Sequence, residues 1–123
     1  MSTAPLTIAI VDDDDAMRRS IERVLHALGY ATESFASSEA FLASGAHARV
    51  KGVILDIHLS GISGIELQRR MRLSGSTLPV IFITAYDEPA TRAEATAAGC
   101  VGYLSKPFHA SDLADTLVRG LTA

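Results

Sequence analysis

The chain has 123 residues, which is the size of one domain, long enough to bury a core but too short for a second domain. Its 48% hydrophobic residues, 20% charged residues and net charge of −3 are typical of a globular protein and argue against direct binding to nucleic acid. The single cysteine, Cys100, excludes an internal disulfide and predicts a small buried residue, while the lack of a signal peptide or a membrane-length apolar run predicts a cytoplasmic protein.

Short apolar runs alternate along the chain with segments of helical spacing. In chain order, we predict a strand at 6–11, a helix from Met17 to Leu28 ended by Gly29, strands at 31–35 and 53–56, a helix at 64–73, a strand at 80–84, a helix at 88–98, a strand at 101–104 and a helix that carries Leu113, Leu117 and Leu121. We expect five strands to alternate with five helices, and the serines at 37–38 and 60–63 to lie in loops. This pattern predicts a doubly wound α/β fold, in which helices cover both faces of a parallel sheet.

Polar residues follow four of these predicted strands. Asp12 and Asp13 come after the first strand, Asp56 ends the third, Thr84 ends the fourth and Lys106 follows the fifth. Each residue alone is ordinary, since turns favour aspartate and threonine. The carboxyl ends of parallel strands share one edge of the sheet, so we expect these five side chains to form one site.

The first of these groups belongs to a run of four aspartates, Asp12 to Asp15. Like charges so close together raise one another's pKa unless a cation neutralises them. Asp12 and Asp13 are therefore expected to hold Mg²⁺, which prefers oxygen ligands. Asp14 and Asp15 have a simpler explanation, because aspartates at a helix start cap free N–H groups and complement the helix dipole.

These parts are sufficient for phosphoryl transfer to an aspartate. Asp56 would be the nucleophile and would form an acyl phosphate. Mg²⁺ and Lys106 would stabilise the charge of the transferred group, since positioning and charge stabilisation supply most of the rate. The hydroxyl of Thr84 would donate to a phosphoryl oxygen only when that group is present.

The same residues resemble the receiver domains of two-component response regulators. The matching segments are Ile10 to Asp14, Asp56 with Gly64 eight residues later, Ile83 to Ala85, and Lys106 to Phe108. The resemblance covers nearly the whole chain, so residues 1–123 are expected to be one receiver domain. Ser20, Phe41 and the segment from Lys106 to Phe108 are most similar to receivers of the FixJ type.

The resemblance implies a flavodoxin-like, CheY-like fold with strand order 2-1-3-4-5. It also implies that a histidine kinase phosphorylates Asp56 to 4-aspartylphosphate. Mg²⁺ would be bound by Asp13, Asp56 and the backbone carbonyl of His58, with Asp12 acting through a water. Such a domain is not an enzyme beyond catalysing its own phosphorylation and dephosphorylation.

A switch is implied as well. On spacing alone, Tyr103 would be a half-buried amphipathic ring on a strand. In the family, Thr84 moves toward the phosphoryl group and the aromatic residue at Tyr103 turns inward, which reshapes the face of the fourth helix, fifth strand and fifth helix. That face then binds a downstream effector or a second copy. The family also has a cis bond between Lys106 and Pro107, which would direct the lysine inward.

The sequence departs from the family pattern just after Asp56. Leu59 and Ser60 stand where methionine and proline are common, and Ser60 lacks the fixed φ of proline, which predicts a looser loop and weaker Mg²⁺ binding. His58 and Tyr86 occupy two variable positions that in the family tune loss of the phosphoryl group. Their bulky rings would screen attacking water, which predicts a long-lived phosphoryl state.

The same residues disfavour three other classes of protein. A phosphatase with an aspartyl nucleophile needs a second aspartate two residues later, where this chain has His58. A nucleotide-binding flavodoxin-like protein needs a phosphate loop after the first strand, where four aspartates would repel the ligand. A receiver that works without phosphate usually lacks one of the acidic residues or the lysine. If the chain is complete, we expect it to act by binding another protein or by relaying phosphate. If it is part of a longer FixJ-type relative, the missing part would be a helix-turn-helix DNA binder.

Overall fold

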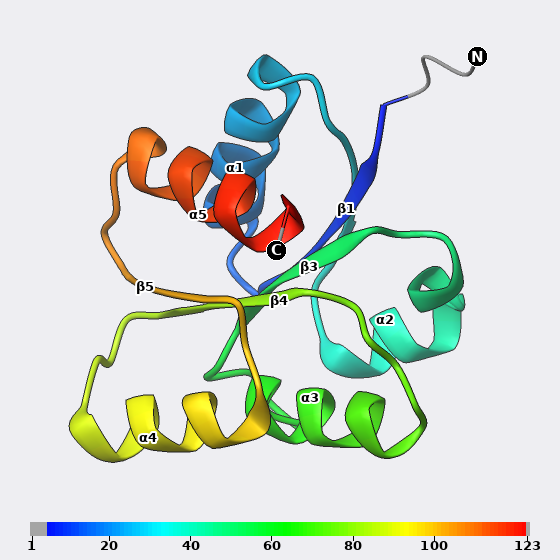
Figure 1. The fold of residues 1–123 in the computed structure, drawn as a ribbon, viewed down its shortest axis with the longest axis vertical. Coiled ribbons are helices and arrows are strands. Elements are labelled where there is room, and N and C mark those ends of the chain that lie inside the picture. Colours follow the sequence, from blue (N-terminus) through cyan, green and yellow to red (C-terminus); the bar gives the residue numbers. More distant parts are fainter. Residues whose placement is uncertain (1–4, 123) are drawn as a thin grey trace.

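The computed structural model describes residues 5–122, which form three layers, with a central sheet between two layers of helices (Figure 1). In chain order the elements are β1 Thr7–Val11, α1 Asp15–Ala27, β2 Ala31–Phe35, α2 Ser38–Ser44, a 3₁₀ turn Ala46–Ala48, β3 Gly52–Asp56, α3 Gly64–Leu73, β4 Val80–Thr84, α4 Pro89–Ala98, β5 Gly102–Ser105 and α5 Ala110–Thr122. Each strand begins and ends within one residue of its predicted range. The predicted alternation of strands and helices is confirmed.

The sheet is parallel throughout, in the order β2-β1-β3-β4-β5. Helices α1 and α5 cover one face, and α2, α3 and α4 cover the other (Figure 1). Successive strand residues point to opposite faces, so Ile8 and Ile10 pack under α1 and α5 while Ala9 and Val11 join the core on the other side. This explains why the central strands read as continuous apolar runs, and it confirms the doubly wound fold with strand order 2-1-3-4-5.

Helix α2 is the element that the sequence did not locate. The prediction of a loop at 37–38 was wrong for Ser38, which is fully buried inside the helix. Ser37 is the N-cap residue, and its hydroxyl accepts the backbone N–H of Ala40 at 3.0 Å. The helix is only one or two turns long and is anchored by Phe41, so it offers too little periodicity for recognition.

Two expectations drawn from composition can be compared with the structure. The thiol of Cys100 is free and half-buried rather than fully buried, and burial raises its pKa. Within residues 5–122, every helix is too short or too polar to span a lipid bilayer.

Candidate functional site

The carboxyl ends of β1, β3 and β5 bring three acidic side chains and one lysine together. Asp12 is fully buried, Asp56 is 5% exposed and Asp13 is exposed. One carboxylate oxygen from each of these aspartates lies within 4.8 Å of the others, which is close enough for a shared cation. Their oxygen-only chemistry fits Mg²⁺.

Lys106 forms the opposite side of this cluster. Its Nζ lies 2.9 Å from Oδ2 of Asp12 and 3.3 Å from Oδ2 of Asp56, so one ammonium pairs with two carboxylates. Burial opposes the charge of Lys106, but the hydrogen bond to Asp12 and the charge of Asp56 outweigh it and raise the pKa of the ammonium. The peptide bond between Lys106 and Pro107 is cis, as expected.

The carboxyl group of Asp56 is electrostatically strained. Burial and the nearby Asp12 carboxylate raise its pKa, and they prevail over Lys106 and the backbone N–H of His58, which lower it. The cluster therefore has more buried negative charge than Lys106 compensates. A bound cation would remove this imbalance, and that gives the site a physical preference for metal.

The aspartate run divides into two functions. Oδ1 of Asp12 accepts the N–H of Asp14 at 2.9 Å, and the Asp14 side chain caps α1 by accepting two backbone N–H groups of its first turn. Asp15 opens the helix and pairs with Arg18, whose Nη1 also donates to the Asp12 carbonyl at 2.6 Å. The capping explanation is confirmed for Asp14, whereas Asp15 lies in the first turn, where its charge complements the helix dipole. Of the four aspartates, Asp12 and Asp13 belong to the cluster with Asp56.

Gly64 explains why a glycine follows Asp56 by eight residues. A Cβ atom at this position would lie 2.2 Å from the Asp56 carbonyl oxygen, so only glycine lets the start of α3 approach β3 so closely. The Gly64 N–H donates to the Ile57 carbonyl at 3.0 Å, and the Ser63 hydroxyl caps α3. This contact fixes the backbone that carries Asp56.

His58 and Tyr86 lie together at the rim of the site. Their rings meet edge to face, with centroids 5.0 Å apart and an interplanar angle of 88°. Both side chains are exposed, and the His58 N–H donates to Oδ1 of Asp56 at 3.2 Å. The role of these rings as a screen against water and metal binding by the His58 carbonyl both remain predictions.

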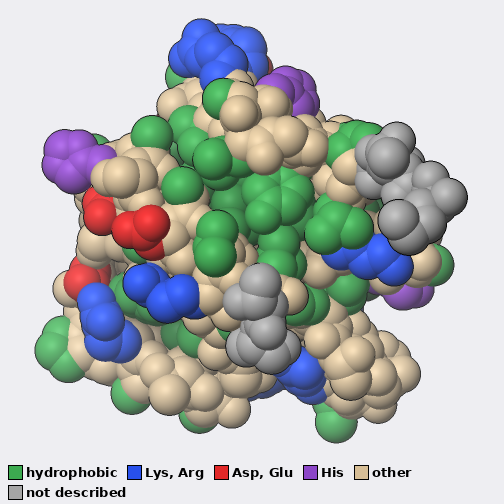
Figure 2. Space-filling model, turned by 45° about the horizontal axis from the view of Figure 1, so that its top comes forward, with side chains coloured by type: hydrophobic (Ala, Val, Ile, Leu, Met, Phe, Trp, Pro, Cys, Tyr) green, Lys and Arg blue, Asp and Glu red, His purple; other side chains and the backbone are tan. Residues whose placement is uncertain are grey.

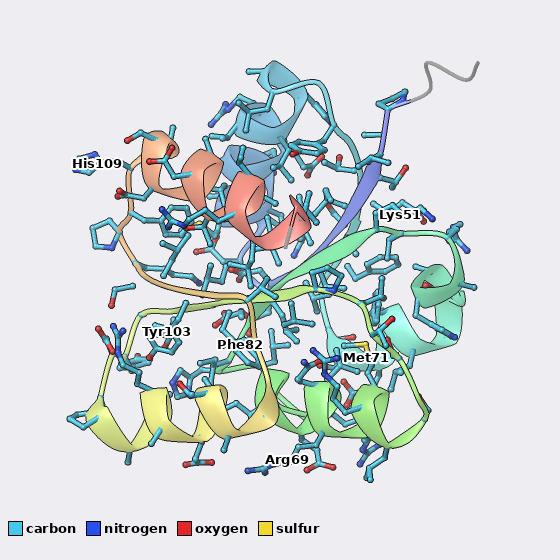
Figure 3. The ribbon with its side chains drawn as sticks, in the orientation of Figure 1. Lys51, Arg69, Met71, Phe82, Tyr103 and His109 are labelled. Carbon is cyan, nitrogen blue, oxygen red and sulfur yellow. The ribbon has the colours of Figure 1, made fainter. Side chains whose placement is uncertain are left out.

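The two predicted switch residues lie outside the charged cluster. Thr84 is fully buried at the end of β4, and its Oγ1 accepts the Tyr86 N–H at 3.0 Å. Tyr103 lies between β5 and the start of α4 (Figure 3), with its ring 4.4 Å below the Arg92 guanidinium. Within residues 5–122, neither side chain hydrogen-bonds to Asp12, Asp13, Asp56 or Lys106.

No role was predicted for Arg92 or Asp87, although the structure places both next to Tyr103. Arg92 Nη2 lies 2.9 Å from Oδ2 of Asp87 across the start of α4. Their five-residue spacing could have suggested an ion pair at a helix start. The contact with Tyr103 could not be seen in the sequence, because it depends on how α4 packs on β5.

Comparisons with known proteins agree with this geometry. The family model described as the response regulator receiver domain matches residues 8–118. The transcriptional regulatory protein TdiR of Thauera aromatica is 31% identical over 115 residues, covering 94% of this chain and 51% of TdiR. The response regulator protein TodT of Pseudomonas putida is 30% identical over 113 residues, covering 92% of this chain and 50% of TodT. The chain thus spans about half the length of these curated relatives.

The solved structures show the same fold. The crystal structure of FixJ-N superimposes with a TM-score of 0.86 and 30% sequence identity, covering 99% of this chain and 96% of that one. The family match extends across both edge strands and includes every element that lines the site, from β1 to β5. The chain belongs to the response regulator receiver domain family of two-component systems.

Proposed function

We propose that this receiver domain accepts a phosphoryl group on Asp56 from a sensor histidine kinase in the cytoplasm, and that this modification switches a protein-binding face. The observation that carries the proposal is the position of Asp56. It ends β3 beside two other aspartates and one lysine, with its carboxylate paired to Lys106 at 3.3 Å. A nucleophile, a charge-stabilising cation and a metal-binding cluster are thereby assembled around one carboxylate.

Accessibility favours Asp56 over Asp12 as the acceptor. Asp12 is fully buried, and its Oδ2 lies 2.9 Å from Lys106 Nζ, closer than the 3.3 Å between Asp56 Oδ2 and the same ammonium. Asp56 keeps 5% of its surface exposed at the floor of the site. A phosphoryl donor entering from the rim would therefore reach Asp56 more readily than Asp12.

The proposed reaction is a displacement at phosphorus. A carboxylate oxygen of Asp56 forms the new P–O bond while the P–N bond of a phosphohistidine breaks, and the leaving histidine keeps the electron pair. Lys106 stabilises the charge that develops on the phosphoryl oxygens. Asp13, Asp56 and the His58 carbonyl would hold Mg²⁺, with Asp12 acting through water, and the bound ion supplies charge neutralisation.

The proposed consequence is a shift between two conformations. A phosphoryl group offers new oxygen acceptors, and the buried Thr84 hydroxyl can donate to one of them. In the family this change is accompanied by inward rotation of the aromatic residue at Tyr103. The face of α4, β5 and α5 would then bind a downstream effector or a second copy of the domain, with transcription as one output, as the name of TdiR suggests for that relative.

Intact mass spectrometry after incubation with acetyl phosphate and Mg²⁺ tests the proposal. Wild type should gain one phosphoryl group, whereas Asp56→Asn should gain none, and EDTA should prevent the gain. Asp115→Asn, an exposed aspartate on α5, is the matched control and should react like wild type. A folded wild type that gains no mass would contradict the proposal and favour an interaction module that works without phosphate.

A further inference from the structure

A second polar cluster lies beside the charged site, on the side of α4. It consists of Asp87 in the β4–α4 loop, Arg92 in α4 and Tyr103 in β5. Arg92 donates to both carboxylate oxygens of Asp87, at 2.9 Å through Nη2 and at 3.4 Å through Nε. The same guanidinium lies 4.4 Å from the centre of the Tyr103 ring. One arginine therefore connects the loop after β4 to the aromatic residue on β5.

The ion pair between Asp87 and Arg92 orients the guanidinium but contributes little to the stability of the fold. The side chains of Arg92 and Asp87 are 57% and 34% exposed, and ion pairs this open to solvent contribute little to stability. The two parallel hydrogen bonds nevertheless fix the plane and position of the guanidinium. The Arg92 hydrogen bonds hold the pKa of Asp87 below its usual range, so the carboxylate stays charged and the pair stays formed.

The hydroxyl group of Tyr103 faces the Asp87 carboxylate, and burial together with this interaction raises the pKa of the hydroxyl. The hydroxyl is inaccessible to solvent, and its contact with Asp87 does not reach the geometry of a full hydrogen bond. A buried hydroxyl without a partner is unfavourable, because it loses its hydrogen bonds to water without replacement. The position of Tyr103 therefore depends on two polar contacts, the Arg92 guanidinium over the face of the ring and the Asp87 carboxylate near the hydroxyl.

The helix that carries Arg92 is anchored at one end. Gln68 and Arg72 of α3 both donate to the Gly99 carbonyl just after α4, with Arg72 Nη2 at 3.2 Å, so the end of the helix is clamped. At its start, the N-cap residue Glu88 makes no side-chain capping bond. In α4, all of which the structure describes, Ala95 is the single buried residue. The start of α4, with Arg92, is thus the end that can move.

The β4–α4 loop links this cluster to the charged site. Thr84 Oγ1 accepts the N–H of Tyr86, the residue that directly precedes Asp87. If the Thr84 hydroxyl moved to a phosphoryl oxygen, it would give up this bond, and the loop that carries Asp87 would loosen. We infer that Arg92, oriented by Asp87, is a positioning residue that holds Tyr103 in its unphosphorylated place, and that loss of the Thr84–Tyr86 bond releases it. The release step rests on the proposed phosphorylation of Asp56, whereas the holding contact does not.

Fluorine NMR of protein labelled with 3-fluorotyrosine tests this inference. The chain has three tyrosines, and the resonance of Tyr103 is assigned by its absence in Tyr103→Phe. In unphosphorylated Arg92→Ala, we expect this resonance to move toward its position in phosphorylated wild type, with a two- to fivefold change, roughly, in the ratio of the two conformations. Arg92→Lys keeps the charge but loses the paired hydrogen bonds, so it should move the resonance less. Asp87→Asn should move it in the same direction as Arg92→Ala.

Arg70→Ala is the matched control, because Arg70 pairs with Glu66 on α3 at 3.2 Å and its aromatic and polar contacts do not include Tyr103. A Tyr103 resonance that stays at the wild-type position in both Arg92→Ala and Asp87→Asn would overturn the inference. Intact mass of the same samples after acetyl phosphate and Mg²⁺ separates the two proposals. If wild type takes up no phosphoryl group while Arg92→Ala still moves Tyr103, the proposed function fails and the holding role of Arg92 stands.

Discussion

Helices α1 and α5 on one face of the sheet and helix α4 on the other are attached to it in different ways. In the layer of α1 and α5, large apolar side chains are fully buried, including Ile21 and Leu25 from α1 and Leu113 and Leu117 from α5. In the opposite layer, α4 buries Ala95 alone among its own residues, all of which are described. Burying a leucine stabilises by about 1.5–3 kcal/mol, whereas an alanine methyl contributes far less. The first layer is therefore a scaffold, and α4 is a loosely held part.

The side of α1 and α5 carries a hydrophobic surface, and the starts of α1 and α4 differ in how they are capped. Figure 2 looks onto the side of α1 and α5, where hydrophobic side chains gather and basic groups lie toward the edges. Between these helices runs a groove of about 410 Å³ lined by Val24, Leu28 and Ala114, among others. Helix α1 begins with a side-chain cap from Asp14, whereas α4 begins with the uncapped Glu88. A phosphorylation signal that moves one helix should therefore move α4 and leave α1 in place.

The largest test of this difference is a pair of core substitutions. Leu117→Ala should lower the free energy of unfolding by about 2–5 kcal/mol, because it opens a cavity between α5 and the sheet. Ala95→Gly should lower it by about 1 kcal/mol, mostly through the lower helix propensity of glycine. Urea denaturation of both variants measures the two values. Equal losses would show that α4 is held as firmly as α5.

Removing the Lys106 ammonium at the charged edge of the sheet should lower the free energy of unfolding almost as much as Leu117→Ala. Lys106→Met removes the ammonium that pairs with Asp12 and Asp56, and leaves two buried carboxylates without a cationic partner. We expect the free energy of unfolding to fall by about 3 kcal/mol, because the remaining buried charges would no longer be compensated by a nearby cation. Added Mg²⁺ should recover part of this loss in urea denaturation. A variant as stable as wild type would contradict the pairing seen here.

Asp56→Asn should raise the free energy of unfolding, in contrast to Lys106→Met. Burial and the Asp12 carboxylate raise the pKa of Asp56 in the folded protein, so the folded state binds this proton more tightly than the unfolded chain does. Raising the pH from the unfolded pKa, about 3.9, through the raised folded value therefore lowers the free energy of unfolding of wild type. Asparagine removes the charge and leaves Asp12 paired with Lys106, so the variant should be more stable at neutral pH by about 1–2 kcal/mol. In denaturation series, this difference should widen from pH 4 to pH 7, and a constant difference would argue against the raised pKa.

Regions that depend on local sequence patterns could be predicted from the sequence, whereas contacts between elements far apart in the sequence could not. The strands, their polar ends and Asp56 could be predicted, because apolar runs and the shared edge of a parallel sheet are local or topological features. Helix α2 was missed because its seven residues bury Phe41 without a repeating pattern. The contact between Arg92 and Tyr103 was missed because it joins α4 to β5, and no local spacing records how a helix lies on a sheet.

The rim of the site offers a kinetic test on the mobile side. His58 and Tyr86 pack edge to face at 5.0 Å, and Tyr86 belongs to the loop that leads to α4. His58→Ala and Tyr86→Ala should each speed the loss of the phosphoryl group severalfold, because either change removes one half of the screen against water. Intact mass followed over time after removal of acetyl phosphate measures the rate. Unchanged rates in both variants would show that the ring pair does not shield Asp56.

The smallest expected effect concerns the loop after β3, which lies against the firmly held start of α3. Ser60 is exposed in this loop and stands where the family commonly has proline. Ser60→Pro would restrict the unbound loop, and the usual gain of 0.4–1 kcal/mol corresponds to Mg²⁺ binding about two- to fivefold tighter. Isothermal titration with Mg²⁺ measures the affinity, and Ser60→Ala serves as the control because it removes the hydroxyl without fixing φ. If proline and alanine bind Mg²⁺ equally, the contact of Gly64 with the Asp56 carbonyl already holds this loop rigid, and the mobility of the domain is confined to the side of α4.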